Sequence, residues 1–263
     1  MRAGVSTACL YPELLEKAFA QLAENGVGLA EIFVNSDCEL HDPYLAEMLA
    51  IQREYGVKVS SVHPYTCGIE PMMLFTEYER RVDDMLDYYK RFFGYMNQFG
   101  AKYFILHGNK PQNKCPDERY FERYARLQDT AGQFGVTVVQ ENVARCTGRS
   151  LDFLVKMADT LGDTAKFVLD VKQARRSDIA PVDAVKALGR HIVHVHYSDC
   201  GDKGDCLKFG DGSFDNRTFF DALRDVGYNG CVVIELYRGS YANAADIADN
   251  YRALDRFLSE NGY

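Results

Sequence analysis

The sequence predicts an α/β protein that folds as a single (β/α)₈ TIM barrel over residues 1–263. The length is close to the ~250 residues typical of such a barrel and too short for two full α/β domains. Short β-rich runs alternate with helical patterns along the whole chain, which indicates a parallel sheet. Because eight such runs occur in one domain-sized chain, we expect the sheet to close into a barrel rather than stay open.

The expected strands are short runs rich in Val, Ile, Phe and Tyr. In chain order they are Val5–Leu10, Leu29–Asn35, Val57–His63, Tyr103–His107, Val136–Glu141, Lys166–Asp170, His191–Tyr197 and Cys231–Leu236. Several of them follow a glycine that fits the position just after the end of a helix, as in Asn25-Gly26 and Phe99-Gly100. These glycines separate a helix from the next strand.

Apolar residues spaced three or four positions apart mark the helices between the strands. One long stripe runs from Leu74 to Met96, a second from Phe121 to Phe134, and a third from Ile247 to Leu258. The chain shows no linker, no low-complexity segment and no strong internal repeat. A single domain over the full length is therefore expected.

The composition excludes several classes of protein. Hydrophobic residues make up 47% and charged residues 26%, which is ordinary for a globular chain and unlike a disordered or fibrous one. The net charge of −8 argues against a broad surface for nucleic acid. No apolar run reaches the ~18 residues of a membrane span, and no secretory signal is apparent. We expect a cytoplasmic protein whose eight cysteines, without a CxxC pair, are free thiols.

Polar residues end four consecutive predicted strands: Glu141, Asp170, His196 and Glu235. The carboxyl ends of barrel strands form the active-site face. Each carboxylate shares a strand face with the valine two positions earlier, so all four side chains point to the barrel mouth if those valines fill the interior. Any one of them alone is explained by a loop cap or an arginine partner. Four together would repel one another without a cation, which favours a divalent ion: Mn²⁺ or Mg²⁺, or, with the imidazole, Co²⁺ or Zn²⁺.

These strand ends and their flanks resemble the xylose isomerase-like superfamily, in the sugar phosphate isomerase/epimerase branch with ketose 3-epimerases and inosose dehydratases. The matching segments are Gln140-Glu141-Asn142-Val143, Leu169-Asp170-Val171-Lys172-Gln173, His194-Val195-His196-Tyr197-Ser198-Asp199, Gly210-Asp211-Gly212-Ser213-Phe214-Asp215 and Val233-Ile234-Glu235-Leu236. The resemblance covers nearly the whole chain and is strongest from Val136 to Leu236. It implies that Glu141, Asp170, His196 and Glu235 bind one divalent ion, with Mn²⁺ as the first choice.

Two other histidines, His63 and His107, also end strands. In the related endonuclease IV branch, histidines at such places bind extra zinc ions, whereas in isomerase-like members they line the substrate pocket. The pocket is the favoured interpretation here. His194 has the same parity as His196 but lies one layer deeper, so we expect it in the barrel interior with a hydrogen-bond partner.

One position departs from the family pattern, which often has histidine three residues after the strand-six aspartate. Gln173 stands there instead, and it can hydrogen-bond a substrate hydroxyl but cannot carry a proton. Three cations follow the strand ends and could bind a phosphate, carboxylate or sugar oxygen: Arg145, Lys208 and Arg238. Each of the three, taken alone, is more often a surface charge than a substrate contact.

The resemblance implies a metal-dependent sugar isomerase or epimerase that works through an enediolate, with a sugar, polyol or sugar phosphate as substrate. The resemblance also implies that Glu141 and Glu235 exchange the substrate proton as catalytic bases. The alternatives are an inosose dehydratase-like lyase, an abasic-site endonuclease and a non-catalytic binding barrel. Metal content separates them: one ion supports the isomerase or lyase, two or three zinc ions the nuclease, and none the binding barrel.

Oligomerisation is left open by the sequence. The aromatic-rich stretch Tyr88–Phe99 could supply apolar surface for a homo-oligomer, or it could pack against the barrel of its own chain.

Overall fold

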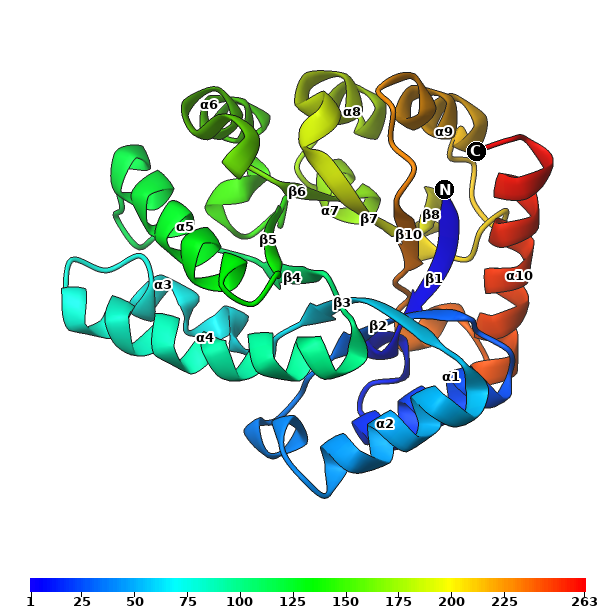
Figure 1. Cartoon of the computed structure of the whole chain (residues 1–263). Coiled ribbons are helices and arrows are strands. Elements are labelled where there is room, and N and C mark those ends of the chain that lie inside the picture. Colours follow the sequence, from blue (N-terminus) through cyan, green and yellow to red (C-terminus); the bar gives the residue numbers. More distant parts are fainter.

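The computed structural model describes residues 1–263, and eight parallel strands close into a barrel at its centre (Figure 1). Around the barrel the strands follow chain order, with β10 between β7 and β1. Their bounds are β1 Arg2–Ser6, β2 Leu29–Phe33, β3 Lys58–His63, β4 Tyr103–Leu106, β5 Thr137–Glu141, β6 Phe167–Asp170, β7 Ile192–Tyr197 and β10 Cys231–Ile234. The predicted (β/α)₈ barrel is confirmed.

The first strand lies a few residues earlier than the sequence pattern indicates. Arg2–Val5 pairs in parallel register with Cys231–Ile234 of β10, and this pairing closes the barrel. The predicted second half of the strand instead forms a 3₁₀ helix over Thr7–Leu10, where the side chain of Ser6 accepts a hydrogen bond from Ala8 N. Local β propensity could not reveal this boundary because the partner strand lies at the far end of the chain.

Helices surround the strands on the outside (Figure 1). They are α1 Leu15–Glu24, α2 Tyr44–Tyr55, α3 Glu70–Met73, α4 Glu79–Phe99, α5 Asp117–Gly132, α6 Leu151–Leu161, α7 Val171–Arg176, α8 Pro181–Leu188, α9 Asn216–Asp225 and α10 Ala244–Glu260. A cluster of 65 buried residues lies mainly between the helices and the strands and forms the main core. Gly100 ends α4 with φ of 70°, a conformation that glycine adopts without strain, as the sequence predicts.

The long stripe predicted from Leu74 is divided in the structure. Its larger part lies in α4, where Tyr89, Phe92 and Met96 are fully buried. Leu74 precedes that helix and Tyr78 is exposed, because the chain turns between α3 and α4. Most of the aromatic stretch that could have served an oligomer is thus packed into the core of its own chain.

The barrel interior holds two small apolar clusters that are separate from the main core. One contains Ile105, Val139 and Val168, and the other contains Leu29 and Val233 together with Cys231. Three of these are the valines two positions before the predicted strand-end carboxylates. The prediction that these valines fill the barrel interior is therefore confirmed, and they form a layer of apolar side chains below the polar strand ends.

One feature of the fold was absent from the sequence-based prediction. A short antiparallel hairpin, β8 Asp199–Gly201 with β9 Gly204–Leu207, follows β7 at the mouth of the barrel. The carboxylate of Asp199 accepts hydrogen bonds from the backbone N–H of Gly210 at 2.9 Å and Phe214 at 3.3 Å. These contacts fold the loop after the hairpin back onto the barrel.

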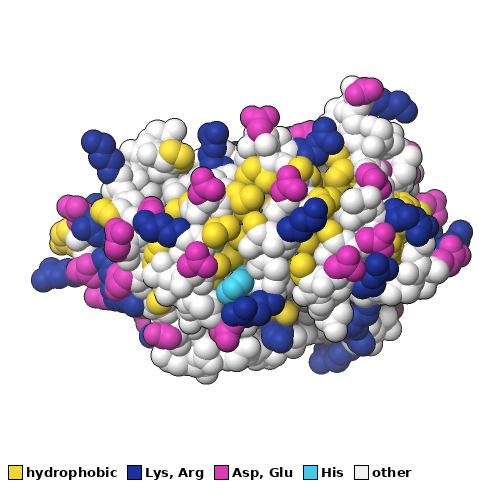
Figure 2. Space-filling model, turned by 90° about the horizontal axis from the view of Figure 1, so that it is seen from above, with side chains coloured by type: hydrophobic (Ala, Val, Ile, Leu, Met, Phe, Trp, Pro, Cys, Tyr) yellow, Lys and Arg dark blue, Asp and Glu magenta, His cyan; other side chains and the backbone are white.

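The exposed surface carries mixed charge. Figure 2 shows acidic and basic side chains interspersed over one face, with apolar side chains between them. None of the helices has the length and apolar character that crossing a membrane requires. All eight cysteines are free thiols, as expected.

Candidate active site

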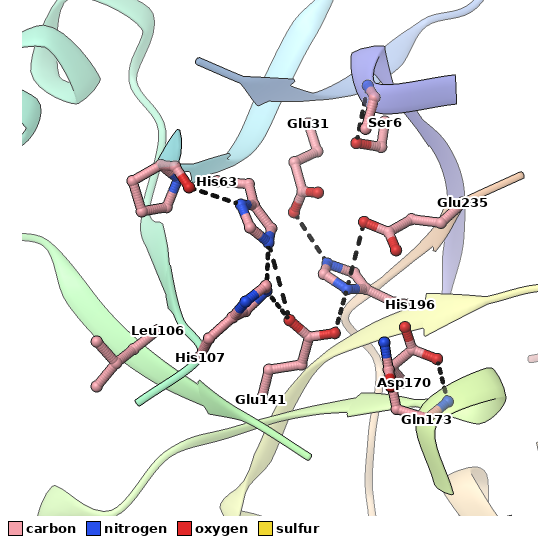
Figure 3. A network of polar contacts seen from close by, with 12 residues as sticks. Ser6, Glu31, His63, Leu106, His107, Glu141, Asp170, Gln173, His196 and Glu235 are labelled. Atoms are coloured by element: carbon pink, nitrogen blue, oxygen red, sulfur yellow. Dashed lines mark hydrogen bonds and ion pairs between the residues drawn. The ribbon is translucent and has the colours of Figure 1, made fainter. Parts of the chain in front are cut away.

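The four strand-end residues singled out by the sequence come together at one end of the barrel (Figure 3). His196 lies between two of the carboxylates: its Nδ1 is 3.6 Å from Glu141 Oε1 and 3.5 Å from Glu235 Oε1. Glu141, Asp170 and His196 offer ligand atoms that all lie within 4.8 Å of one another. The side chains of these three are buried, whereas that of Glu235 is 17% exposed.

Strand register brings these residues into contact. Asp170 of β6 is paired directly with His196 of β7, and His196 is also paired with Val233 of β10, two residues before Glu235. Asn142, which follows β5, connects the next strand end: its Oδ1 accepts from Asp170 N at 2.7 Å, and its Nδ2 donates to Asp170 O at 3.0 Å. The backbone thus holds the polar groups on adjacent strands side by side.

Three buried polar atoms in this group make no hydrogen bond: Glu141 Oε2, Asp170 Oδ2 and His196 Nδ1. The first two have ion-pair partners in His107 and Lys172, whereas His196 Nδ1 has only the more distant carboxylates of Glu141 and Glu235. A buried polar atom without a partner costs about 1–3 kcal/mol, so such atoms are rare unless they serve a bound group. Carboxylate oxygens and an imidazole nitrogen are donors that divalent Mn, Mg, Co and Zn ions accept. The residues present therefore fit a divalent ion.

Neighbouring charges shift the protonation of these groups. Burial by itself would lower the pKa of His196, but the carboxylates of Glu235 and Glu31 outweigh it and hold that pKa well above its usual value. Burial raises the pKa of Asp170 to about 6, against the opposing effect of Lys172. His196 must lose its Nδ1 proton before that nitrogen can bind an ion, so ion binding would release a proton.

Glu31 is a site residue that the sequence analysis did not identify. It comes from β2 and is fully buried, and its carboxylate points toward His196 (Figure 3). Its Oε2 is 3.1 Å from His196 Nε2, 3.3 Å from His194 Nε2, and accepts from Ser61 Oγ at 2.7 Å. The signal was a carboxylate inside an apolar strand, on the same face as Leu29. His194 is a buried interior histidine with hydrogen-bond partners, as predicted.

His63 and His107 lie directly against the same group of residues. Their Nε2 atoms are 2.8 Å apart, and His107 Nε2 is 3.0 Å from Glu141 Oε2. Burial lowers the pKa of His63 to about 4, whereas the carboxylate of Glu141 overcomes burial and raises the pKa of His107 well above its usual value. The structure places both histidines beside a proposed catalytic carboxylate. Their assignment to the substrate pocket stays a prediction, since with Glu141 they also form a potential metal-binding set.

Lys172 is a second residue that the sequence analysis did not assign to the site. Its Nζ lies 3.3 Å from Asp170 Oδ2 and 3.3 Å from Glu235 Oε2, and its side chain is 4% exposed. The available signal was a lysine two residues after a strand-end aspartate. No spacing rule shows that such a side chain turns back onto that aspartate.

The remaining predicted residues lie at the edge of this group. Gln173 Oε1 accepts from the backbone N–H of Ala144 at 3.0 Å, which leaves its amide nitrogen available for a ligand. Lys208 pairs with Asp246 at 2.7 Å, and Arg238 donates to Tyr241 O at 2.9 Å. Arg145 is exposed. The structure does not bring these three cations into contact with the ligand set, and their role in substrate binding stays a prediction.

Comparison with known proteins agrees with this architecture. The family model described as xylose isomerase-like TIM barrel matches residues 19–257. The uncharacterized protein MJ1311 of Methanocaldococcus jannaschii is 23% identical over 257 residues, covering 89% of this chain and 83% of that protein.

Solved structures show the same fold at low sequence identity. D-psicose 3-epimerase, crystallised in the presence of D-fructose, superimposes with a TM-score of 0.79 at 16% identity over 98% of each chain. The IolI protein, with a binding zinc atom, gives 0.77 at 18% identity over 96% of each chain. The match of the family model over most of the sequence shows that this chain belongs to the xylose isomerase-like TIM barrel family.

Proposed function

We propose that this protein is a metal-dependent isomerase or epimerase of a sugar, a polyol or their phosphates. The observation that carries the proposal is that two carboxylates from different strand ends approach the same imidazole nitrogen, with Glu141 Oε1 at 3.6 Å and Glu235 Oε1 at 3.5 Å from His196 Nδ1. Epimerisation requires a proton-transfer group on each face of the substrate, and we assign these two roles to the two carboxylates, which come from the end of β5 and from the residue after β10.

The neighbours in fold support the substrate class. D-psicose 3-epimerase is a sugar epimerase by its name, and its structure was determined with a ketose sugar present. The IolI structure contains zinc. Since identity with each is below one fifth, the proposal rests on the residues of this chain, with the neighbours as support.

Glu141, Asp170, His196 and Glu235 would hold the ion. A bound divalent ion supplies Lewis-acid chemistry: it stabilises negative charge on the oxygens of a sugar when the proton beside the carbonyl is removed. Glu235 is more exposed than Glu141, 17% against 3% for the side chains, so it faces the entrance while Glu141 lies deeper. Each carboxylate can take or return that proton from its own side.

The surrounding residues would orient the substrate. His63 and His107 lie on the Glu141 side and can hydrogen-bond hydroxyl groups there. The free amide nitrogen of Gln173 can donate to a further hydroxyl but cannot transfer a proton. Proton transfer is therefore assigned to the two glutamates.

A screen of ketoses, inososes and sugar phosphates in D₂O with added Mn²⁺ tests the proposal. Deuterium should enter the carbon beside the carbonyl of at least one compound, and product analysis then separates epimerisation and isomerisation from loss of water by a lyase. Absence of exchange across the panel, with the ion bound, would contradict the proposed function.

A further inference from the structure

Lys172 places a positive charge between two of the proposed metal ligands. Its Nζ is 3.3 Å from Asp170 Oδ2 and hydrogen-bonds Glu235 Oε2 at 3.3 Å. Its side chain is 4% exposed, so solvent does little to screen these contacts. This lysine is not part of the ligand set described above, and its position requires an explanation.

The fold gives this side chain little freedom. Helix α7 begins directly after β6, and the Asp170 carboxylate caps it by accepting from Gln173 N at 2.8 Å. Lys172 is the second residue of that helix, so its side chain starts next to the strand end. The ring of Tyr237 covers the ammonium, with Nζ 5.1 Å from the ring centroid, and Arg176 donates to the Tyr237 hydroxyl at 3.0 Å. The ammonium is therefore held against the two carboxylates.

The ammonium and a divalent ion would use the same two carboxylates. Each neutralises negative charge that would otherwise be buried without a partner. An ion bound by Asp170 and Glu235 would stand a few ångströms from Nζ if the lysine stayed in place, and like charges at that distance in a buried site repel strongly. A protonated lysine has no lone pair to offer the ion, so it cannot serve as a ligand instead.

We propose that Lys172 is an internal competitor of the divalent ion, an inference that rests on the metal-dependent function proposed above. Its ammonium occupies Asp170 and Glu235 in the ion-free protein, keeps the centre folded without metal, and must give up these contacts when the ion binds. The centre is thus built for reversible rather than permanent occupation by the ion, and Lys172 sets its affinity.

The test is a Mn²⁺ titration of the purified full-length protein by calorimetry, without substrate, alongside melting temperatures with and without the ion. Lys172→Met keeps a long apolar side chain and removes the charge. It should bind Mn²⁺ at least about tenfold more tightly than the wild type, and its ion-free form should melt at a lower temperature. Lys172→Arg keeps the charge and should not gain affinity.

Lys156→Met is the matched control, because Lys156 of α6 is half exposed and pairs with Asp117 of α5 at 2.7 Å. It should leave Mn²⁺ affinity unchanged. If Lys172 only supported the fold, replacing it would lower the melting temperature but would not raise the affinity for Mn²⁺. If Lys172→Met does not fold, Lys172→Gln, which is also neutral and can hydrogen-bond both carboxylates, takes its place.

The outcomes separate this inference from the proposed function. If the wild type binds Mn²⁺ and the neutral variants bind it equally or more weakly, Lys172 is not a competitor, and the metal-dependent function is untouched. If neither the wild type nor the neutral variants bind Mn²⁺ or Zn²⁺, the metal centre itself is wrong, and both proposals fail together.

Discussion

Glu31 Oε2 lies 3.1 Å from His196 Nε2, on the side of the imidazole opposite Glu141 and Glu235. A carboxylate only accepts hydrogen bonds, so this contact places a hydrogen on Nε2 and leaves Nδ1 for the ion. Such a carboxylate–histidine pair also fixes the orientation of the ring. Glu31 thus acts on the proposed centre through His196.

Replacing Glu31 with Gln should weaken Mn²⁺ binding by about 10- to 100-fold, the usual effect of losing a partner behind a metal-binding histidine. Calorimetric titration measures this directly. Ser61→Ala is the control, since Ser61 donates to the same carboxylate oxygen and does not touch His196. Equal Mn²⁺ affinity in Glu31→Gln and the wild type would mean that Glu31 serves only the barrel interior.

Asp170→Asn should separate the metal role of Asp170 from its role in the fold. Asp170 caps α7, and Asn is an equally good cap, but the change also removes one of the two charge partners of Lys172, so the ion-free variant should fold and melt at a lower temperature than the wild type. In the wild type, Mn²⁺ at one hundred times Kd should stabilise by ~2.7 kcal/mol, and in the variant most of this gain should be lost. Thermal unfolding with Mn²⁺ and with EDTA is the measurement. If Mn²⁺ stabilised the variant as much as the wild type, Asp170 would not be a metal ligand.

Glu141→Gln and Glu235→Gln should each lose about 10²–10⁴-fold in turnover, even with excess Mn²⁺. Each substitution keeps the shape of the side chain but replaces the basic carboxylate with an amide that cannot accept the substrate proton. In an epimerase the two losses should differ in D₂O. For one substrate epimer, Glu141→Gln should stop proton exchange and Glu235→Gln should spare it, and for the other epimer the pattern should reverse. If both variants keep near-normal turnover with the ion bound, His63 or His107 becomes the candidate base.

Metal content tests the role of the two histidines beside Glu141. As substrate-binding residues they predict one ion per chain, measured by elemental analysis after equilibration with Mn²⁺ or Zn²⁺. His107→Ala should keep that ion and raise KM. Two ions in the wild type, with one lost in His107→Ala, would make the His63–His107–Glu141 set a second metal site and favour the nuclease alternative.

The buried carboxylate of Glu70 should make the stability of the folded protein depend on pH. This carboxylate is fully buried and accepts from Gly108 N at 2.6 Å, and burial raises its pKa from 4.5 to about 7. Between these two values the folded protein binds more protons at Glu70 than the unfolded chain does, so stability falls as pH rises through this window. The full loss, reached above pH 7, is about 3 kcal/mol.

Glu70→Gln imitates the protonated carboxyl group and removes this loss. The melting temperature of the variant, relative to wild type, should therefore rise steadily from pH 5 to pH 8. A difference between the two proteins that stays constant over this range would show that Glu70 titrates near its ordinary pKa.

Much of the proposed centre could be predicted from the sequence because the relevant signal is local. Glu141 and Asp170 are the last residues of their strands, and His196 is the last but one of β7. Side chains alternate along a strand, so the positions of the valines and the polar residues determine which face each occupies. The carboxyl ends of parallel strands meet on one face of a barrel, which is enough to bring these residues together.

The contacts of Glu31 and Lys172 were decided only by the tertiary structure. Glu31 and His196 are 165 residues apart, and no sequence pattern near either residue indicates that the two side chains are in contact. Their meeting depends on closure of the barrel, which brings the interior faces of β2 and β7 together across the axis. Lys172 follows Asp170 closely, but whether its side chain faces solvent or the site depends on Glu235 and Tyr237, which follow β10. Alternation along a strand is a property of the local backbone, whereas the partner of a buried charge is set by packing between distant segments.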